Sequence, residues 1–579
     1  MPVTANSKGL QVRAVLSGVA LAAALASAVP AGVAALADED GSTLSWLMMA
    51  AVGMAKRQAT NQSSRAQDCS VELSESAYPN LNLSLDAALV DAALDVATSE
   101  DAHNVTVDEA TAAAALARER RVAVRDEFVW SWRAYEAHAW GRDELRPLSQ
   151  TADDWVPGGM GLTILDSIDA LSLMELDSEL GRARAFVSNL SFNVNAEVNT
   201  FETTIRALGG LLAAHSLTGD ALYLERATDL GKRLLAAFKT GTGLPAPNVN
   251  LKTRKPGHAH WSYDFCTAEI GSLALEFNEL SRATGDRRFA EAVERVGDHL
   301  ARRARRLRPK YLMPIFFTPD GEPSTTVMTS LGARGDSYYE YLLKAWLQSD
   351  RTEPRLRARY VNSVGAIAKH LVRRTAGGVT FVAEQYPHGP LRPKMDHLAC
   401  FLPGMLALGA ASDGIDGEGR NHSASHMELA QQLMDTCWLM YERTPTGLAA
   451  EIVMFHEHGG ATDFSSSAED AHTLLRPETV ESLFVLWRLT HDQRYRERGW
   501  RIFEAFRTHC RVETGGYASA ESVLELPVRL RDKQESFWLA ETLKYLFLLF
   551  SDDDVLPLDQ WVFNTEAHPL PINLGEAAR

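Results

Sequence analysis

Ionisable side chains recur near the start of seven apolar segments that have the spacing of helices. Each segment ends at an aspartate in a short turn, and successive turning aspartates lie 43 to 79 residues apart. The ionisable residue stands 11 to 18 residues before that aspartate. The seven are Asp166, Glu202, Glu269, Asp336, His397, Glu478 and Glu541. Acidic groups that are crowded together shift one another's pKa, which suits general acid–base catalysis.

The length of this repeat fits one helical hairpin, in which a helix, a short turn and a returning helix follow one another. If the first helices of the hairpins run side by side in a closed ring, the ionisable groups collect at one end of the ring. Aromatic neighbours supply flat apolar faces on which sugar rings stack. These neighbours are Phe201, Tyr338, Tyr339, Phe537 and Trp538. The pattern predicts a helical ring whose active site hydrolyses glycosidic bonds.

Each charged group also has a simpler structural explanation. Glu478 and Glu481 share one face in the first turns of a helix and could both be solvated there. Glu202 and Arg206 have the i, i+4 spacing of a surface salt bridge. Asp336 could cap the helix that follows it. The equivalent placement of these groups in successive repeats favours a shared site.

Helical periodicity is clean in several segments. From Val480 to Trp487 apolar residues recur at i, i+3, i+4 and i+7. Gly209 and Gly210 interrupt another such segment at a cost of about 1 kcal/mol each relative to alanine, so a close helix contact is expected there. No alternating run is long enough for a large sheet, although residues 555–570 could form a short hairpin. The predicted fold class is all-α.

Composition excludes several classes of function. Hydrophobic residues make up 46% and charged residues 23% of the 579 residues, as in an ordinary globular protein. The net charge of −17 argues against nucleic acid as a partner, because phosphate binding needs clustered Lys and Arg. The basic run 302–308 has acidic neighbours and is interpreted as a solvated helix face. Five cysteines without CxxC spacing are too few for a disulfide scaffold.

The N-terminal region has the composition of a targeting segment. Residues 14–37 are nearly all small or apolar and follow Lys8 and Arg13. Residues 35–37 resemble a signal cleavage site, yet the apolar run is also long enough to span a bilayer. We predict a signal peptide or signal anchor at 1–40, a stem or linker at 41–115 and a catalytic domain at 116–575.

Five N-glycosylation sequons favour the secretory pathway, because they follow an apolar N-terminal segment. They begin at Asn61, Asn82, Asn104, Asn189 and Asn421. We expect a monomer in the lumen of the endoplasmic reticulum or Golgi, with a type II membrane anchor at its N-terminus if the segment is not cleaved.

In its motifs the chain resembles glycoside hydrolase family 47, the class I α-1,2-mannosidases of the endoplasmic reticulum and Golgi. The matching stretches follow one another in family order across about residues 116–575. They are GRDELRPLS (141–149), GLTILDSIDAL (161–171), FETTIRALGGLLAAHSLTGD (201–220), GARGDSYYEYLLKAW (332–346), KMDHLACFLPG (394–404), PTGLAAEI (445–452), LLRPETVESLF (474–484), ESFWLAETLKYLFLLF (535–550) and FNTEAHPLPI (563–572). The resemblance implies an (αα)7 barrel of helical hairpins with a short C-terminal β-hairpin plug.

The resemblance also implies a reaction, the Ca²⁺-dependent, inverting hydrolysis of terminal α-1,2-linked mannose from high-mannose N-glycans. By motif match Glu202 is the general acid, acting through a water. Glu478 is the leading general base and Asp336 the competing candidate. Inversion needs an acid and a base about 6.5–9.5 Å apart so that the nucleophilic water fits.

Thr565 matches the family's calcium residue, which contributes its hydroxyl and its backbone carbonyl. Because Ca²⁺ takes six to eight oxygen ligands, waters held by surrounding carboxylates are expected to complete the shell. Those carboxylates are Glu269, Glu478, Glu481, Glu541 and Glu566. The cation can grip vicinal hydroxyls of the terminal mannose.

Other matches imply a mannose pocket and a disulfide. The pocket residues are Arg206, His397, Arg476 and Phe537, although His397 could also be a structural histidine. Cys400 and Cys437 match the family's disulfide, which would contribute about 3–4 kcal/mol in the chain-entropy model.

Arg334 is the residue expected to determine which mannose branch is cleaved. It lies two residues before Asp336, where reticulum-type members resemble this chain and Golgi-type members carry a smaller apolar residue. A guanidinium makes several directed hydrogen bonds, so we expect preferred trimming of the nine-mannose glycan to an eight-mannose product. Two alternatives are a degradation-enhancing mannosidase-like lectin for misfolded glycoproteins and a non-catalytic carbohydrate-binding module.

Overall fold

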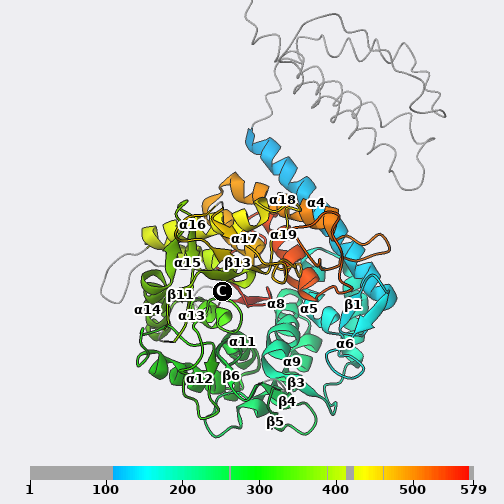
Figure 1. The fold of residues 1–579 in the computed structure, drawn as a ribbon. Helices are drawn as coiled ribbons and strands as arrows, with labels where there is room; N and C mark the ends of the chain where they lie inside the picture. The colour runs from blue at the N-terminus through cyan, green and yellow to red at the C-terminus, as the bar shows by residue number, and fades with distance from the viewer. Residues whose placement is uncertain (1–108, 260–261, 388, 413–422, 461, 573–579) are drawn as a thin grey trace, which may run out of the picture. The chain divides into compact units, whose positions relative to one another are not determined.

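The computed structural model describes residues 109–259, 262–387, 389–412, 423–460 and 462–572 (Figure 1). The predicted signal segment, nearly all of the predicted stem, four of the five sequons and Asp413 lie outside these ranges. Within them, no helix combines the length and apolar character needed to cross a membrane. The predicted anchor at 14–37 is therefore not addressed by this finding.

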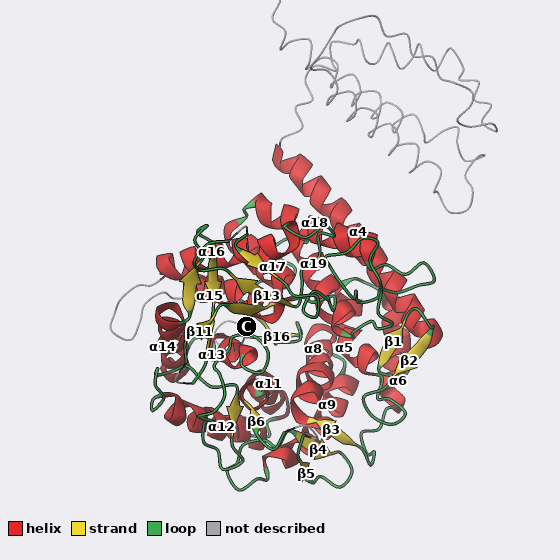
Figure 2. Cartoon of the chain, in the orientation of Figure 1, coloured by secondary structure: helices red, strands yellow, loops and turns green. Residues whose placement is uncertain are grey.

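Seven inner helical segments form a ring, seen in Figures 1 and 2. Each contacts the next, and the last contacts the first. In chain order they are α5 (Leu162–Leu173); α7, η2 and α8 (Thr200–Glu202, Thr203–Leu208, Gly209–Thr218); α10 and α11 (Thr267–Gly271, Ala274–Thr284); α13 (Asp336–Gln348); η4 and α15 (His397–Phe401, Leu402–Ser412); α17 (Glu478–Thr490); and η5 and α19 (Trp538–Leu543, Lys544–Leu549). The predicted barrel is confirmed.

A second layer of helices surrounds this ring. It consists of α4 (Glu109–His138), α6 (Asp177–Asn189), α9 (Ala221–Leu234), α12 (Arg288–Ala304), α14 (Pro354–His370), α16 (Ser423–Glu442) and α18 (Gln493–His509), with the short η3 (Leu235–Phe238) after α9. Six outer helices pack against the inner segment that precedes them, as predicted for hairpins.

The seventh pair differs from the predicted order. No outer helix follows α19 among the described residues; instead α4, at the start of the barrel, packs against the last inner segment. The indole of Trp538 donates a hydrogen bond to Ser131 Oγ of α4 (3.0 Å). Arg121 of α4 also lies 5.8 Å from the Phe547 ring. Helix α4 therefore serves as the outer helix of the last inner segment.

Two of the repeated aspartates, Asp220 and Asp492, act as N-caps of the returning helices. Asp220 accepts a hydrogen bond from the Leu222 amide (3.0 Å), and Asp492 accepts one from Arg494 (3.0 Å). The residue before each, Gly219 (φ 70°) or His491 (φ 54°), ends the inner helix in the left-handed conformation. These two aspartates thus mark the start of the second helix of their hairpins.

Gly209 and Gly210 do mark a close contact, as predicted. A Cβ on Gly210 would lie 2.1 Å from the Leu165 carbonyl oxygen of α5. A Cβ on Gly209 would lie 2.7 Å from the amide nitrogen of Asn564. The two glycines let α8 approach both a neighbouring inner helix and the C-terminal hairpin.

Small antiparallel sheets of two or three strands lie around the barrel. Only the C-terminal hairpin β15–β16 was predicted from the sequence. They are β1–β2 (Glu144–Arg146, Thr151–Asp153), β3–β4–β5 (Glu197–Asn199, Asn248–Asn250, Pro256–Gly257), β6–β7 (Phe265–Cys266, Phe316–Phe317), β8–β9 (Val372–Arg374, Thr380–Val382), β10–β11 (Glu384–Gln385, Leu391–Arg392), β12–β13–β14 (Lys394–Asp396, Ile452–Phe455, Phe464–Ser465) and β15–β16 (Trp561–Phe563, Pro569–Pro571). Strands β3, β6 and β12 lead directly into inner segments and fix where those segments begin.

The predicted C-terminal hairpin is confirmed. Strands β15 and β16 pair antiparallel with Phe563 opposite Pro569. Their tip, residues 564–568, enters the ring, where β15 contacts α13 and β16 contacts α8 and α11 (Figure 2). The hairpin therefore closes the inside of the barrel.

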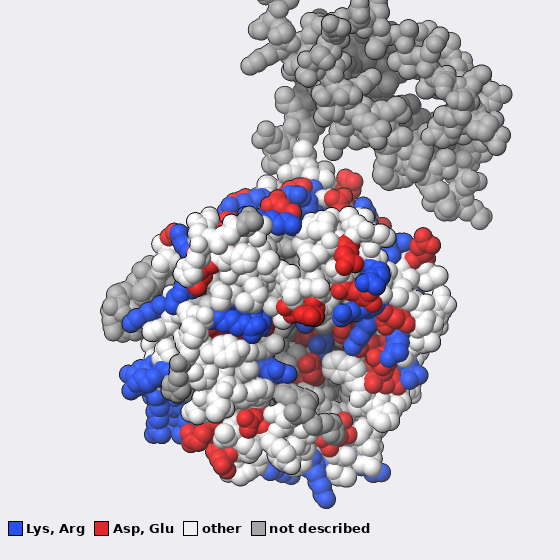
Figure 3. Space-filling model, viewed as in Figure 1, with Lys and Arg blue, Asp and Glu red and all other residues white. Residues whose placement is uncertain are grey.

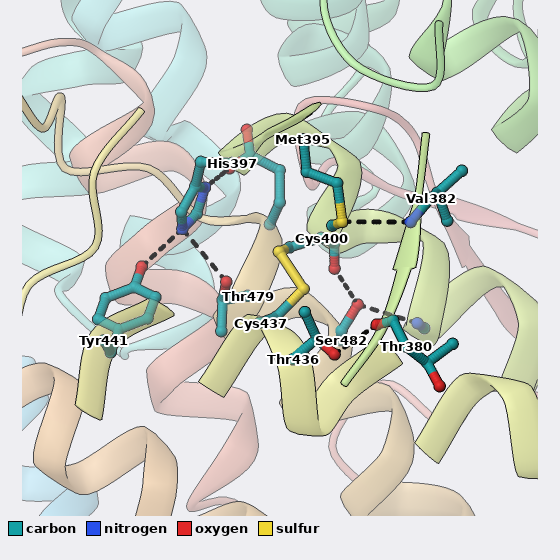
Figure 4. The surroundings of a disulfide bond; sticks show 12 residues. Thr380, Val382, Met395, His397, Cys400, Thr436, Cys437, Tyr441, Thr479 and Ser482 are labelled. Atoms are coloured by element: carbon teal, nitrogen blue, oxygen red, sulfur yellow. Dashed lines mark hydrogen bonds and ion pairs between the residues drawn. A yellow bond between two sulfur atoms is a disulfide. The ribbon is translucent and has the colours of Figure 1, made fainter. Parts of the chain in front are cut away.

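The predicted disulfide is also present. Cys400 of η4 is bonded to Cys437 of α16, with a Cα–Cα distance of 5.9 Å (Figure 4). It ties the start of an inner segment to its outer helix. Of the other cysteines in the described part of the chain, Cys266 and Cys510 are buried thiols.

Candidate active site

The ionisable residues of the repeats gather at the end of the ring where the inner segments begin. Glu478 and Asp336 are the first residues of α17 and α13, and His397 is the first of η4. Glu202 ends the single turn of α7, and Glu269 lies in the first turn of α10. Because the N-terminal end of a helix favours negative charge, this arrangement stabilises carboxylates there. Figure 3 shows a hollow on this face, with acidic and basic side chains beside it.

Glu202 is held from both sides. The Asn199 side chain caps the helix by accepting a hydrogen bond from the Glu202 amide (2.8 Å). Arg206 Nε donates to Glu202 Oε2 (2.9 Å), and the same guanidinium binds Glu566 and Ser536 Oγ (3.0 Å). Since Arg206 is buried, the explanation of this pair as a surface salt bridge is wrong.

Glu478 is anchored by His397. The distance from His397 Nδ1 to Glu478 Oε2 is 2.6 Å, while His397 Nε2 contacts Tyr441 Oη (2.7 Å) and Thr479 Oγ1 (3.2 Å; Figure 4). Burial alone would raise the pKa of Glu478, but the His397 hydrogen bond and charge, together with Arg476, lower it below its ordinary value. Glu478 is therefore buried and ionised, so a solvated first turn does not describe it.

Phe537 joins the two halves of the site. The Arg206 guanidinium lies 5.8 Å and that of Arg476 5.9 Å from its ring. Arg476 Nη1 is 3.8 Å from Glu478 Oε1, just as Arg206 contacts Glu202. Both guanidinium groups lie within 6 Å of one aromatic ring, which brings Glu202 and Glu478 into a common site.

Asp336 and Glu269 form a third side of the site. Burial raises the pKa of Asp336 to about 7, reinforced by the charges of Glu340, Glu478 and Asp396. Burial and the charge of Glu202 raise the pKa of Glu269 to about 7 as well. Both groups are therefore partly protonated at neutral pH.

Asp336 accepts a hydrogen bond from the Ser337 amide (2.8 Å), but its side chain does not serve as the N-cap of α13. The residue at the cap position is Gly335. Two residues before Asp336, the exposed Arg334 has a left-handed backbone (φ 74°), and its guanidinium lies 5.5 Å from the Phe316 ring.

The tip of the C-terminal hairpin forms the floor. The Asn564 side-chain amide donates to the Ile205 carbonyl (2.8 Å) and to Glu276 Oε1 (2.7 Å). Its side-chain oxygen Oδ1 accepts from the Glu566 amide (2.9 Å). Thr565, between them, contacts Tyr341 Oη through its amide (3.3 Å). These bonds hold Thr565 and Glu566 at a fixed height in the ring.

Beneath the floor lies a buried network of charges. His568 Nδ1 is 2.9 Å from Asp169 Oδ2, and His568 Nε2 is 3.2 Å from Asp166 Oδ1. Lys544 Nζ donates to the same Asp169 oxygen (2.7 Å). Asp166 is thus a supporting residue and keeps His568 in place, which explains why its repeat position carries an acid.

Negative charge is in excess around Thr565. Burial and neighbouring carboxylates raise the pKa of Glu541 and Glu566 well above the ordinary range, although Arg206 acts in the opposite direction. Burial also raises the pKa of Glu481 to about 7, against the effect of Lys344. The described residues contain no cluster of three or more Asp, Glu, His or Cys with direct metal-ligand geometry. The hydroxyl and the backbone carbonyl of Thr565 are oxygen ligands of the kind that a hard cation accepts, and the nearby carboxylates could hold its water ligands.

Sequence reasoning missed two contributors. Trp155, in the loop before α5, is 40% exposed and its ring lies 5.2 Å from the Arg206 guanidinium. Glu451 Oε2 accepts from Arg476 Nε (2.5 Å) and fixes that arginine. Both residues lie outside the repeat pattern, and although Glu451 falls within the matching stretch 445–452, nothing in that stretch indicated its contact with Arg476.

Two cavities of about 470 and 590 Å³ lie away from this gathering of charges and are lined mainly by residues of outer helices α12 and α14 and of inner helices. Of the residues predicted for the site, only the aromatic neighbour Tyr338 lines them. The gathering of charged groups, rather than cavity size, therefore identifies this site.

Fold and site together define a glycoside hydrolase built on a helical barrel, and the chain belongs to glycosyl hydrolase family 47, whose sequence model matches residues 127–572. Human endoplasmic reticulum mannosyl-oligosaccharide 1,2-alpha-mannosidase is 46% identical over 460 residues, covering 78% of this chain and 64% of the human protein. Drosophila melanogaster mannosyl-oligosaccharide alpha-1,2-mannosidase IA is 43% identical over 470 residues, covering 80% and 69%. The alignment thus spans slightly less than two thirds of the human relative.

A solved structure shares the fold. The alpha-1,2-mannosidase from Trichoderma reesei superposes with a TM-score of 0.71 at 27% identity, covering 79% of this chain and 99% of that one. The agreement extends over the whole of the fungal enzyme, which supports the assignment of the barrel.

Proposed function

We propose that this chain hydrolyses terminal α-1,2-linked mannose from high-mannose N-glycans with inversion of configuration. The two mannosidases named above support the substrate class. The observation that carries the proposal is the placement of Glu202 and Glu478 beside two arginines that both lie near Phe537. A sugar ring on the aromatic face would lie between an acid and a base.

Glu478 is the general base in this proposal. A base must be ionised, and the lowered pKa of Glu478 meets that need, whereas Asp336 with a pKa of about 7 is partly protonated. The His397 hydrogen bond holds one carboxylate oxygen. The other oxygen remains to take a proton from the attacking water.

Glu202 is the general acid. It delivers a proton through a water to the glycosidic oxygen while the water activated by Glu478 attacks the anomeric carbon from the opposite face. Arg206 holds the Glu202 carboxylate in place, and Phe537 keeps bulk solvent from one side of the sugar.

Calcium fits the residues at the floor. Thr565 offers a hydroxyl and a carbonyl oxygen, and Glu269, Glu478, Glu481, Glu541 and Glu566 would hold its water ligands. The pKa values of Glu541 and Glu566 are raised first by burial and then by the charges of neighbouring carboxylates, and a divalent cation would offset both effects. When bound, the cation supplies a hard Lewis acid for the vicinal hydroxyls of the terminal sugar.

Arg334 selects the branch. It stands at the exposed rim before Asp336, where its guanidinium can donate several hydrogen bonds to an extended glycan. We therefore propose preferred removal of one mannose from the nine-mannose glycan. Arg334→Leu is expected to spread cleavage over several branches, and an unchanged product pattern would remove this role.

The compartment follows from the same proposal. High-mannose N-glycans occur in the lumen of the endoplasmic reticulum and Golgi, and the N-terminal signal peptide or anchor, the stem and the sequons fit that location. The boundaries 1–40, 41–115 and 116–575 and the monomeric state stay predictions.

Digestion of a nine-mannose glycan with and without a calcium chelator tests the proposal. We expect one mannose to be released with calcium, a loss of at least 100-fold in rate with chelator, and recovery on adding calcium back. Glycan binding without mannose release in calcium would instead favour the lectin alternative.

A further inference from the structure

The turn formed by residues 330–335 carries Arg334 and leads directly into Asp336. The amides of Gly335 and Asp336 both donate to the Gly332 carbonyl (3.2 and 3.1 Å), which makes the turn tight. Arg334 has a positive φ of 74°. This conformation costs a non-glycine residue free energy and persists only where the surrounding structure holds it. The direction of the Arg334 side chain therefore depends on what fixes this turn.

Two buried carboxylates hold the two halves of the turn. Ser330 Oγ donates to Glu384 Oε1 of β10 (3.0 Å), and the Ala333 amide donates to Asp396 Oδ2 of β12 (3.0 Å). Gly332 lies so close to Asp396 that a Cβ there would be 2.2 Å from Oδ2. Glu384 and Asp396 thus grip the turn before and after Gly332.

Lys394 joins these carboxylates. Its Nζ lies 3.1 Å from Glu384 Oε1 and 2.6 Å from Asp396 Oδ1. All three side chains are buried. Without the ammonium group, two buried carboxylates would be left uncompensated, and one would protonate or move toward solvent. Either response would release the Ser330 or the Ala333 bond.

We propose that Lys394 is a positioning residue for branch selection: it holds Glu384 and Asp396 so that the turn presents Arg334 in one orientation. The inference rests on the proposed function, because Arg334 is there the group that selects the branch. Lys394 itself lies beneath the turn and acts only through it. A purely structural role, in which Lys394 merely stabilises the β12–β13 pair, makes a different prediction.

Lys394→Met removes the charge and keeps the length of the side chain, and Lys394→Arg keeps the charge. A matched control is Arg496→Met, because Arg496 is also buried but binds the Leu549 and Ser551 carbonyls at the opposite end of the barrel (2.8 and 2.9 Å). The variants are made in the full chain. Their melting temperatures are measured so that variants with the same loss of melting temperature can be compared with each other.

Two readouts decide the inference. Hydrogen exchange of peptides covering 330–336 is expected to rise at least 10-fold in Lys394→Met and to stay at the wild-type rate in Lys394→Arg and Arg496→Met. On the nine-mannose glycan, Lys394→Met should raise KM about 10-fold and spread cleavage over several branches. Its kcat on α-1,2-mannobiose should change less than threefold, because the side chains of Glu202 and Glu478 are bound by Arg206 and His397 and not by Lys394 or the turn.

If residues 330–336 of Lys394→Met exchange hydrogen at the wild-type rate, the inference is overturned, whatever the activity of that variant. A product pattern equal to that of Arg496→Met at the same loss of melting temperature would also overturn it. If the wild-type chain releases no mannose, the proposed function fails by itself. The exchange rates and the affinity for the intact glycan then still decide whether Lys394 positions the turn.

Discussion

At the scale of single residues, environment rather than residue type separates the carboxylates of this site. Glu478 and Asp336 both begin inner helices, yet a histidine and an arginine contact the first while only acids and a backbone amide surround the second. The sequence placed both residues at the same end of the ring, but it could not assign the partners. His397 lies 81 positions from Glu478 in the chain.

Glutamine substitution at Glu478 tests the choice of base. Glu478→Gln is expected to lower kcat on the nine-mannose glycan by about 10²–10⁴, the usual worth of a general base. Asp336→Asn is the comparator and should lower kcat at least 10-fold less at pH 7, since Asp336 is already partly protonated there. Steady-state kinetics with calcium measures both, and the reverse order would make Asp336 the base.

Asp336 should also leave a mark on stability. Its pKa is raised to about 7 in the folded state, so between about pH 4 and pH 7 the folded protein binds more protons than the unfolded chain. Stability conferred by the protonated form is therefore lost as pH rises through this window. Asp336→Asn should flatten that fall. When the stability of each protein is expressed relative to its own value at pH 4, the variant should exceed the wild type by about 1–3 kcal/mol at pH 8. Urea unfolding in calcium-free buffer at several pH values measures this, and parallel curves would contradict it.

At the scale of elements, helices were predictable and strands were not. Periodicity identified the inner helices, and two of the repeated aspartates, Asp220 and Asp492, proved to be N-caps of outer ones. Strands such as β3 and β12 have three residues each, which is too short for alternation to be visible. Only the C-terminal hairpin was anticipated, because residues 555–570 combine apolar pairs with a polar centre.

The hairpin tip depends on Asn564, whose side chain makes four hydrogen bonds, to η2, α11 and the tip itself. Asn564→Ala should cost about 2–4 kcal/mol of unfolding free energy, because buried partners are left unsatisfied. It should also lower calcium-dependent activity, since Thr565 and Glu566 lose their support. The exposed Asn362→Ala on α14 is a control expected to stay within about 0.5 kcal/mol. Equal effects of the two variants would show that the tip does not need Asn564.

The disulfide links the segment that begins with His397 to the helix that carries Tyr441, the hydroxyl partner of His397. Replacing Cys400 and Cys437 by alanine should lower stability by about 3–4 kcal/mol through loop entropy. Cys510→Ala, at another buried cysteine, is the control and should cost less, because no loop is opened. Thermal unfolding distinguishes the two, and a double variant no weaker than the control would refute the stabilising role.

At the scale of the whole barrel, the central result is convergence. Residues from 202 to 566 in the sequence meet at one end of the ring because seven inner segments run in parallel register and the C-terminal hairpin rises to meet them. The repeat spacing predicted this ring, but not that α4 supplies the seventh outer helix. That pairing joins segments hundreds of residues apart, which no local pattern encodes.

The anomeric configuration of the first mannose released tests this convergence most directly. Proton NMR of the wild-type chain with nine-mannose glycan and calcium should show β-mannose appearing first, followed by slow mutarotation, because Glu202 and Glu478 act on opposite faces of one sugar. Initial release of α-mannose would contradict the account, since retention requires two successive displacements through a covalent glycosyl-enzyme intermediate instead of direct attack by the water that Glu478 activates.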